Sequence, residues 1–375
     1  MDHLSKLTES TLNISINPCE LSPEQKIELC KSFAEEIIQE DELLKLFSSS
    51  KGPLTAYDGF EPSGRMHIAQ GLLKTIIVNK LAKCGVNFVF WVADWFALLN
   101  NKLDGDLGKI QDVGRYMIEV WKAAGMCMDS VKFLWSSEEI LKRPDEYWSL
   151  VFDIGRKNSL KRVMRCTQIM GRSESDDLCA SQIFYPVMQC ADIFFLKADI
   201  CQLGMDQRKV NMLAREYCDS QKSRGQIKKP IILSHHMMLG LGEGQEKMSK
   251  SVPGSAIFME DSPEDVNSKI KKAFCPYGVV EKNPVLDYYK TIVFPLTPVV
   301  VISGKDKENK EFFKEYRSYA DFESDFKADI ITPKDVKTYL ALRINELLSP
   351  IREHFETNAE AKALLARIKK FNVTR

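Results

Sequence analysis

The fold is decided by residues 54–94, which read LTAYDGFEPSGRMHIAQGLLKTIIVNKLAKCGVNFVFWVAD. Residues 54–60 have the pattern of a short strand, and the EPSG that follows predicts a turn. Apolar side chains then recur at helical spacing from Ile68 to Leu81, and Gly85 ends the helix. Residues 86–93 are almost wholly apolar and precede Asp94, as expected of a parallel strand buried on both faces. The segment therefore predicts a strand, a helix and a second, parallel strand.

The same alternation continues beyond this segment. We predict a helix at 110–125, a strand at 131–134, a helix at 185–196, a strand at 199–203, a helix at 206–218 and a strand at 231–233. Residues 136–180 look helical and more charged, so we expect them to form an insertion between the halves of the sheet. The fold class is α/β, with a Rossmann-like parallel sheet that binds ligands at the carboxyl ends of its strands.

The chain has 375 residues, more than a single hydrophobic core usually supports. Residues 1–52 are expected to be helical, since Pro23 follows Ser22 in a helix-start signal and apolar residues from Ile27 to Ile37 form one stripe. Residues 53–262 are expected to form the Rossmann-like catalytic domain. Beyond it, helical patterns dominate, so residues 263–375 are predicted to form a mainly α-helical C-terminal domain.

Composition excludes several classes of protein. Lys plus Arg (52) equals Asp plus Glu (52), so no global basic field indicates nucleic acid. The longest apolar run has six residues, whereas a spanning helix needs about 20, so no membrane segment is expected. Ten Cys without a C-x-x-C and five His leave no metal-ligand spacing. The first nine residues show no secretory or organellar address, so we expect a cytoplasmic protein.

The turn after the first strand carries the first candidate site, PSGRMHIAQ at residues 62–70. Exposed amides and the dipole at a helix start favour phosphate, and His67 there can donate to a phosphate oxygen. His67 as a capping or packing residue explains the pattern equally well.

The second candidate site is KMSKS at residues 247–251, in a Gly-rich stretch after the last predicted strand. Lys247 and Lys250 are able to neutralise a polyphosphate when the loop closes, and nearby glycines permit such closure. A solvated, charged loop is the alternative.

With these two motifs, the chain resembles class I aminoacyl-tRNA synthetases, which carry an HIGH element and a KMSKS loop. Here the first element reads HIAQ, which keeps His67 and replaces the second His by Gln70. The departure removes a second His, although Gln70 still has hydrogen-bond donors for phosphate or ribose.

The third candidate site is a set of polar residues on the predicted helix at 185–196. Tyr185, Gln189 and Asp192 are spaced i, i+4 and i+7 and so share one helix face, with Pro186 expected in the first turn. Polar side chains on an otherwise apolar helix need partners, which are a ligand or a structural hydrogen-bond network.

These residues, together with YDGFEPSG at 57–64 and DQRK at 206–209, resemble the archaeal and eukaryotic cytosolic tyrosyl-tRNA synthetases. The resemblance implies that Tyr57 and Asp192 hold the phenolic hydroxyl of tyrosine. It implies that the substrate's ammonium and carboxylate are held by Tyr185, Gln189 and Gln207. Residues implied in ATP binding are Gly59, Gly64, His67, Gly204, Asp206, Met248 and Lys250, with His67, Gln70, Lys247 and Lys250 assisting catalysis.

By this resemblance the chain attaches tyrosine to tRNA(Tyr), using ATP with Mg²⁺ on its phosphates and forming a tyrosyl-adenylate. Asp206 as an ordinary helix N-cap is compatible with its role at the ribose. The family also implies a homodimer through the insertion, where Phe152 and Leu160 lie.

Two surfaces are candidates for tRNA contact. The first is a basic stripe of the insertion, formed by Arg156, Lys157, Lys161, Arg162 and Arg165, for which a solvated helix face is the alternative. The second is the opening of the C-terminal domain, KIKKAFCP at 269–276, where Phe274 and Phe294 are candidates for base stacking or for the core.

Three other functions stay open. They are a tryptophan-specific relative, a synthetase-derived binding protein without activity, and a nucleotidyltransferase that acts on something other than tRNA. Asp192 beside Tyr57 argues against tryptophan, because an indole N–H is only a donor.

Overall fold

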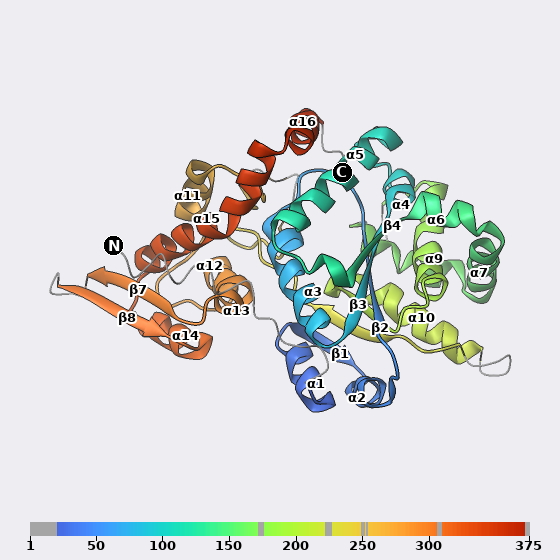
Figure 1. Ribbon diagram of the computed structural model, residues 1–375, viewed down its shortest axis with the longest axis horizontal. Helices are drawn as coiled ribbons and strands as arrows, with labels where there is room; N and C mark the ends of the chain where they lie inside the picture. Colours follow the sequence, from blue (N-terminus) through green and yellow to red (C-terminus); the bar gives the residue numbers. More distant parts are fainter. Residues whose placement is uncertain are drawn as a thin grey trace.

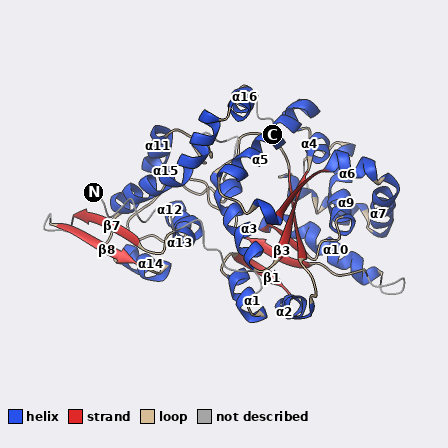
Figure 2. Ribbon diagram, in the orientation of Figure 1, coloured by secondary structure: helices blue, strands red, loops and turns tan. Residues whose placement is uncertain are grey.

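The computed structural model describes residues 21–171, 176–221, 227–248, 252, 254–305 and 310–371 (Figure 1). Within them lies one six-stranded sheet, formed by β1 (Ala34–Ile38), β2 (Leu54–Phe60), β3 (Val86–Val92), β4 (Val131–Trp135), β5 (Ile200–Gly204) and β6 (Ile231–His235). Helices surround this sheet on both faces (Figure 2).

The first half of the chain contributes helices α1 (Pro23–Lys31), α2 (Glu40–Ser49), α3 (Lys74–Lys83), α4 (Asp94–Leu99), α5 (Leu107–Ala123), α6 (Ser136–Lys142), α7 (Pro144–Lys157) and α8 (Leu160–Met164). The second half contributes α9 (Ala180–Phe195), α10 (Arg208–Ser220), α11 (Pro263–Lys272), α12 (Pro284–Tyr288), α13 (Phe294–Leu296), α14 (Tyr319–Lys327), α15 (Pro333–Thr357) and α16 (Ala359–Ile368). Short turns of 3-10 or π geometry are η1 (Ala69–Leu73), η2 (Lys102–Gly105), η3 (Met128–Ser130), η4 (Thr167–Met170), η5 (Met205–Gln207) and η6 (Tyr289–Val293).

The strand order is β1-β6-β5-β2-β3-β4. All neighbouring pairs are parallel except β1 with β6, so the predicted parallel α/β sheet is confirmed. From β2 the chain proceeds to β3 and β4 on one side, and later to β5 and β6 on the other. The order therefore reverses between β2 and β5, and a ligand crevice is expected at their carboxyl ends.

The two faces of the sheet are buried by different helices. Ala56 of β2 and Phe88 of β3 belong to one apolar cluster with residues of α3 and α5. Tyr57 of β2 and Trp91 of β3 lie on the opposite face of the sheet. They belong to a second cluster with residues of α7, α9 and α10. Because strand residues alternate between faces, the consecutive residues Tyr57 and Asp58 serve different sides of the sheet.

The C-terminal part is mainly helical, as predicted, but contains an antiparallel hairpin of β7 (Val300–Lys305) and β8 (Glu311–Tyr316). Phe294 packs in this part, edge-on to Phe322 with ring centroids 5.6 Å apart. Long helix α15 and α16 return to α5, where His354 Nε2 lies 2.9 Å from Glu119 Oε2. No helix among the described segments is both long enough and apolar enough to cross a membrane.

Two sequence predictions of local structure were wrong. The described part of residues 1–52 is not all helical, because residues 34–38 add strand β1 to the sheet edge beside β6. Helix α9 begins at Ala180, so Pro186 lies inside it and not in its first turn. The helix starts this early because of a capping box, in which the Cys179 amide donates to Gln182 Oε1 at 3.0 Å. Cys is an unusual N-cap residue, so the sequence did not indicate this start.

Asp206 does not cap α10. The residue before that helix is Gln207, and no side chain caps it. Asp206 lies instead in the short turn η5 and lines the crevice.

Candidate active site

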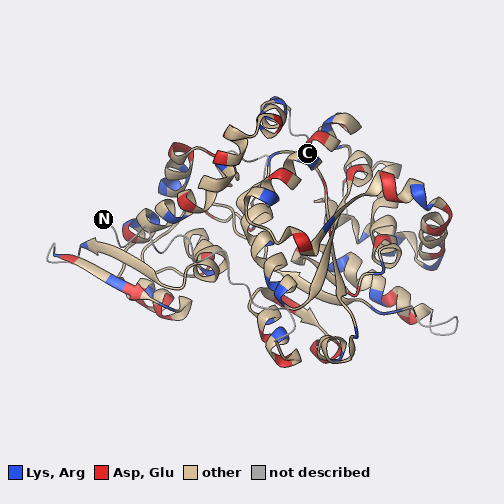
Figure 3. Cartoon of the chain, in the orientation of Figure 1, with Lys and Arg blue, Asp and Glu red and all other residues tan. Residues whose placement is uncertain are grey.

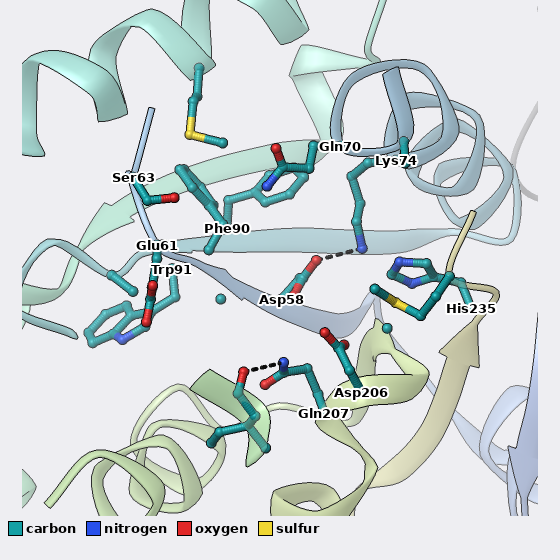
Figure 4. Close-up of a pocket in the computed structure, with 18 of the residues that line it drawn as sticks. Asp58, Glu61, Ser63, Gln70, Lys74, Phe90, Trp91, Asp206, Gln207 and His235 are labelled. Carbon is teal, nitrogen blue, oxygen red and sulfur yellow. Dashed lines mark hydrogen bonds and ion pairs between the residues drawn. The ribbon is translucent and has the colours of Figure 1, made fainter. Parts of the chain in front are cut away.

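A cavity of about 300 Å³ opens where β2 and β5 end (Figure 4). Twelve of the predicted site residues line it: Tyr57, Gly59, His67, Gln70, Tyr185, Gln189, Asp192, Gly204, Asp206, Gln207, Lys247 and Met248. Gly64 is not part of the lining, and Lys250 lies outside the described residues. Residues more than 190 positions apart in the sequence thus meet in one hollow at the topological switch point.

One end of the cavity is a buried cage of phenols around a carboxylate. Tyr57 of β2, Tyr147 of α7 and Asp192 of α9 are all at most 1% exposed. The Tyr147 hydroxyl donates to Asp192 Oδ1 at 2.8 Å. Burial raises the pKa of Asp192 well above its usual range, and the hydrogen bond from Tyr147 opposes that shift. This end is dry and has acceptors for a hydroxyl group.

Tyr147 was missed from the sequence. It lies in the insertion, and its spacing from Asp192 carries no signal because α7 and α9 are packed together only in the fold. Gly59 is explained by the same cage, since a Cβ there would lie 3.1 Å from the Tyr57 hydroxyl oxygen.

The middle of the cavity holds amides and a second carboxylate. Gln189 Nε2 donates to Gln207 Oε1 at 3.0 Å, and Gln207 Nε2 donates to the Ile169 carbonyl at 3.1 Å. These two amides therefore do form a structural hydrogen-bond network, as the alternative interpretation expected, although both also line the cavity. Glu61, which the sequence prediction left out, lines the cavity and accepts from Asn100 Nδ2 at 3.0 Å. Its carboxylate beside the buried Tyr185 gives this part of the cavity negative charge.

The predicted phosphate-binding turn is held by the chain that follows the KMSKS loop. The Ile68 amide donates to the Ile257 carbonyl at 2.9 Å, and the Met259 amide donates to the Met66 carbonyl at 2.9 Å. Gly64 has φ 144°, a backbone conformation that side chains with a Cβ rarely adopt, so its role is to shape the turn. Beyond His67 the chain enters the π-helical turn η1, a geometry often found at functional sites.

The described start of the KMSKS loop reaches the same cavity. Lys247 Nζ lies 3.9 Å from Asp206 Oδ2, and its side chain is 52% exposed. Met248 is buried, and its amide donates to the Met238 carbonyl at 3.2 Å. The start of the loop thus lines the same cavity as the phosphate-binding turn, with the cation of Lys247 beside Asp206.

The basic stripe of the insertion is not one helix face. Arg156 and Lys157 end α7, whereas Lys161 and Arg162 lie on the separate helix α8. Arg156 and Lys157 each pair with Asp153 at 2.6 Å, and Arg162 pairs with Glu216 at 3.0 Å. Figure 3 shows Lys and Arg interspersed with Asp and Glu over the helices of both parts of the molecule. Three of the five cations thus have carboxylate partners in this structure, two of them on the same Asp153.

Sequence comparisons and structural comparisons agree with this site. The family model described as "tRNA synthetases class I (W and Y)" matches residues 48–349. A cytoplasmic tyrosine–tRNA ligase of Arabidopsis thaliana is 56% identical over 94% of this chain and 90% of its own length. The tyrosyl-tRNA synthetase of Leishmania major in complex with tyrosinol is 51% identical with a TM-score of 0.85, over 93% of this chain and 52% of that one.

This chain also matches a more distant relative of known structure along that relative's whole length. The tyrosyl-tRNA synthetase of Pyrococcus horikoshii, complexed with L-tyrosine, is 34% identical with a TM-score of 0.84, over 92% of this chain and 100% of that one. Matches in sequence and in structure therefore both extend over nearly all of the chain. The chain belongs to the class I tRNA synthetases of the tryptophan and tyrosine family.

Proposed function

We propose that this protein is a tyrosine–tRNA ligase, which uses ATP to form tyrosyl-adenylate and then transfers tyrosine to tRNA(Tyr). The observation that carries the proposal is a single cavity with a buried phenol-binding cage at one end and a phosphate-binding turn at the other. The tyrosine-specific relatives support it, since they match over nearly the whole chain.

Selectivity for tyrosine would arise in the cage of Tyr57, Tyr147 and Asp192. A substrate hydroxyl gives the buried Asp192 carboxyl and the Tyr57 phenol a further hydrogen-bond partner, whereas phenylalanine buries them without that partner. At the other end of the amino acid, the Glu61 carboxylate would attract the ammonium group, with Tyr185 and Gln189 as its neighbours. An indole has no acceptor to complement the donor of a phenol, which disfavours tryptophan.

The reaction requires no enzyme nucleophile. The carboxylate of tyrosine attacks the α-phosphate of ATP, and pyrophosphate leaves with the electrons of the broken P–O bond. His67, Gln70, Lys247 and Lys250 would stabilise the growing negative charge, so that catalysis comes from positioning and electrostatics. In the second step a ribose hydroxyl of the terminal adenosine of tRNA attacks the adenylate carbonyl and releases AMP.

Magnesium is expected to arrive on the phosphates of ATP. The described residues contain no group of three or more His, Cys, Asp or Glu side chains that could hold a metal. Of the carboxylates at the nucleotide end, Asp58 is already paired with Lys74. The donor set thus fits a metal–nucleotide complex as substrate and does not form a protein cage.

Other parts of the molecule have proposed roles as well. Residues 263–375 would bind the anticodon region of tRNA, and residues 53–262 would form the catalytic domain. The exposed side chains of Phe152 and Leu160, 66% and 65% accessible, would form part of a homodimer interface. The name of the Arabidopsis relative favours a cytoplasmic location.

The test is pyrophosphate exchange into ATP with each of the twenty amino acids, followed by transfer to total tRNA. We expect exchange with tyrosine and charging of tRNA(Tyr). Exchange with tryptophan alone would overturn the cage assignment, and absence of exchange with every amino acid would support a noncatalytic protein.

A further inference from the structure

The predicted phosphate-binding turn is anchored by side chains that lie outside the cavity. Arg65, which precedes Met66 and His67 in the turn, contacts two carboxylates of the segment after the KMSKS loop. Its Nε lies 2.5 Å from Glu260 Oε1, and its Nη2 lies 3.0 Å from Asp261 Oδ1. The two carboxylate side chains are almost completely buried. Because a buried carboxylate needs a charged partner, these contacts fix the turn against the segment.

Arg65 also lies against an aromatic residue that pairs with His67. The guanidinium carbon of Arg65 is 4.3 Å from the centroid of the Phe258 ring. The backbone of Phe258 forms an isolated antiparallel bridge with His67. A planar guanidinium can bind carboxylates at its edge and an aromatic ring at its face, whereas an ammonium has no such planar fork. These contacts therefore use the specific shape of arginine.

The hydroxyl of Tyr116 in α5 connects the same turn to Glu260. It accepts from the Met66 amide at 3.1 Å and donates to Glu260 Oε2 at 2.7 Å. Burial raises the pKa of Tyr116 well above its usual range, and the charge of Glu260 adds to the rise, so the hydroxyl keeps the proton that it donates. Glu260 thus accepts from Arg65 with one oxygen and from Tyr116 with the other. The amide that directly precedes His67 is held in one direction.

The segment that carries the two carboxylates is itself fixed on two sides. Lys269 Nζ of α11 lies 2.5 Å from Asp261 Oδ2, and Arg352 Nε of α15 donates to the Asp261 carbonyl at 2.7 Å. On the other side, a Cβ built on Gly71 would lie 2.2 Å from Met259 Sδ, so η1 packs directly on the segment. The segment is therefore a firm support, and a change in its contacts with the turn would move the turn.

We propose that Arg65, Tyr116 and Glu260 are positioning residues for adenylate formation, which hold His67 where it donates to the phosphates of ATP. All three are among the described residues, and they lie outside the lining of the cavity, so they act through the turn and not on the substrate. A displacement of the order of 1 Å is enough to lower a reaction rate strongly. This inference rests on the proposed function, because it takes His67 as a phosphate-binding group.

The test measures the single-turnover rate of adenylate formation in the unmodified protein and in Tyr116→Phe, which removes the hydroxyl and keeps the ring. The rate should fall about tenfold, the equivalent of one hydrogen bond, and the Kd for tyrosine should change less than about twofold. The matched control is Tyr217→Phe, which removes a hydroxyl that donates to Asp153 outside the cavity and should leave the rate unchanged.

Substitutions of Glu260 test the other end of the contact. Glu260→Ala removes the acceptor of both Arg65 and Tyr116 and should slow adenylate formation about 20- to 50-fold. Glu260→Gln keeps an acceptor oxygen and should recover part of this loss. The melting temperature of each variant separates a displaced turn from a loss of folding.

A double substitution decides whether Tyr116 acts through His67. In a protein that already carries His67→Ala, adding Tyr116→Phe should slow adenylate formation no further, because the group that the hydroxyl positions is gone. Effects that multiply would show that Tyr116 acts independently of His67 and would overturn the proposal. An unchanged rate in Tyr116→Phe would overturn it as well.

Failure of this inference and failure of the proposed function are distinguishable. Absence of tyrosine-dependent pyrophosphate exchange in the unmodified protein counts against the ligase activity and overturns the inference with it. Exchange in the unmodified protein, together with unaltered rates in the variants, counts against the inference alone.

Discussion

The proposed tyrosine end and the proposed nucleotide end of the cavity are built in opposite ways. At the phenol end, Tyr57, Tyr147 and Asp192 come from one strand and two long helices and are almost completely buried. At the nucleotide end, His67 forms an isolated bridge with Phe258, Asp206 lies in the short turn η5, and the Lys247 side chain is 52% exposed. A rigid, dry end suits discrimination between substrates, because an unpaired buried group is penalised heavily. An open end suits binding of a charged nucleotide and closure over it.

The largest expected effect lies at the phenol end. We predict that Asp192→Ala lowers kcat/KM for tyrosine by roughly 10²- to 10³-fold, since the substrate hydroxyl and the buried phenol of Tyr147 both lose their hydrogen-bond partner. The measurement is pyrophosphate exchange over a range of tyrosine concentrations, with phenylalanine as the competing substrate. The preference for tyrosine over phenylalanine should fall as well. A preference that stays unchanged would mean that Asp192 only supports the fold.

The next effect concerns the nucleotide end. Lys247→Ala should slow adenylate formation about 10- to 100-fold and leave the KM for tyrosine nearly unchanged, because the charge of Lys247 acts mainly as pyrophosphate leaves. Single-turnover kinetics measures this rate. Lys132→Ala, which removes an exposed lysine of β4, is the matched control. If the KM for ATP rises and the rate constant does not change, Lys247 binds the ground state and the contrast between the two ends is weaker than proposed.

Features with a regular local sequence pattern could be predicted, and features without one could not. Buried parallel strands have long apolar runs, and the helix face of Tyr185, Gln189 and Asp192 is set by regular spacing, so both were found. Strand β1 was missed because its residues AEEII lie between helical segments and pair with β6, whose sequence is almost 200 positions away.

Contacts between distant elements had no sequence signal. Tyr147 meets Asp192 only because α7 packs on α9, and Gln202 of β5 meets Lys74 only because α3 packs on the sheet. Motifs therefore predicted which residues line the cavity, whereas the fold was needed to show which side chains hold them in place.

A substitution of Tyr147 at the phenol end should have a smaller effect. Tyr147→Phe removes one hydrogen bond to Asp192 but keeps the ring, which packs edge-on against Phe195 at 5.1 Å. We expect the KM for tyrosine to rise about three- to tenfold. Tyr217→Phe is the matched control, because its hydroxyl donates to Asp153 at 2.6 Å outside the cavity. Equal effects of the two substitutions would show that the hydroxyl of Tyr147 acts through stability alone.

The smallest effect is a pH dependence of stability at the open end, where His236 joins three parts of the molecule. Its Nδ1 lies 3.1 Å from Glu35 Oε2 of β1, and its Nε2 lies 3.0 Å from Asp287 Oδ1 of α12. The hydrogen bond to Asp287 raises the pKa of His236, with a further contribution from Glu35, while burial opposes the rise. A raised pKa in the folded state means that the stabilisation is complete below the unfolded pKa of about 6.5 and is lost as pH rises through the folded value.

Thermal unfolding of the unmodified protein and of His236→Asn between about pH 5.5 and 8.5 measures this contribution. The melting temperatures should differ most at the acidic end and converge at the alkaline end. Since 38% of the side chain is exposed, solvent screening keeps the difference below about 1 kcal/mol, or one to two degrees. A difference that grows with pH would instead place an uncharged His236 in the stabilising contact. His236 would then connect the elements at the nucleotide end through neutral hydrogen bonds. The carboxylates of Glu35 and Asp287 beside it favour the opposite result, in which its positive charge stabilises the fold.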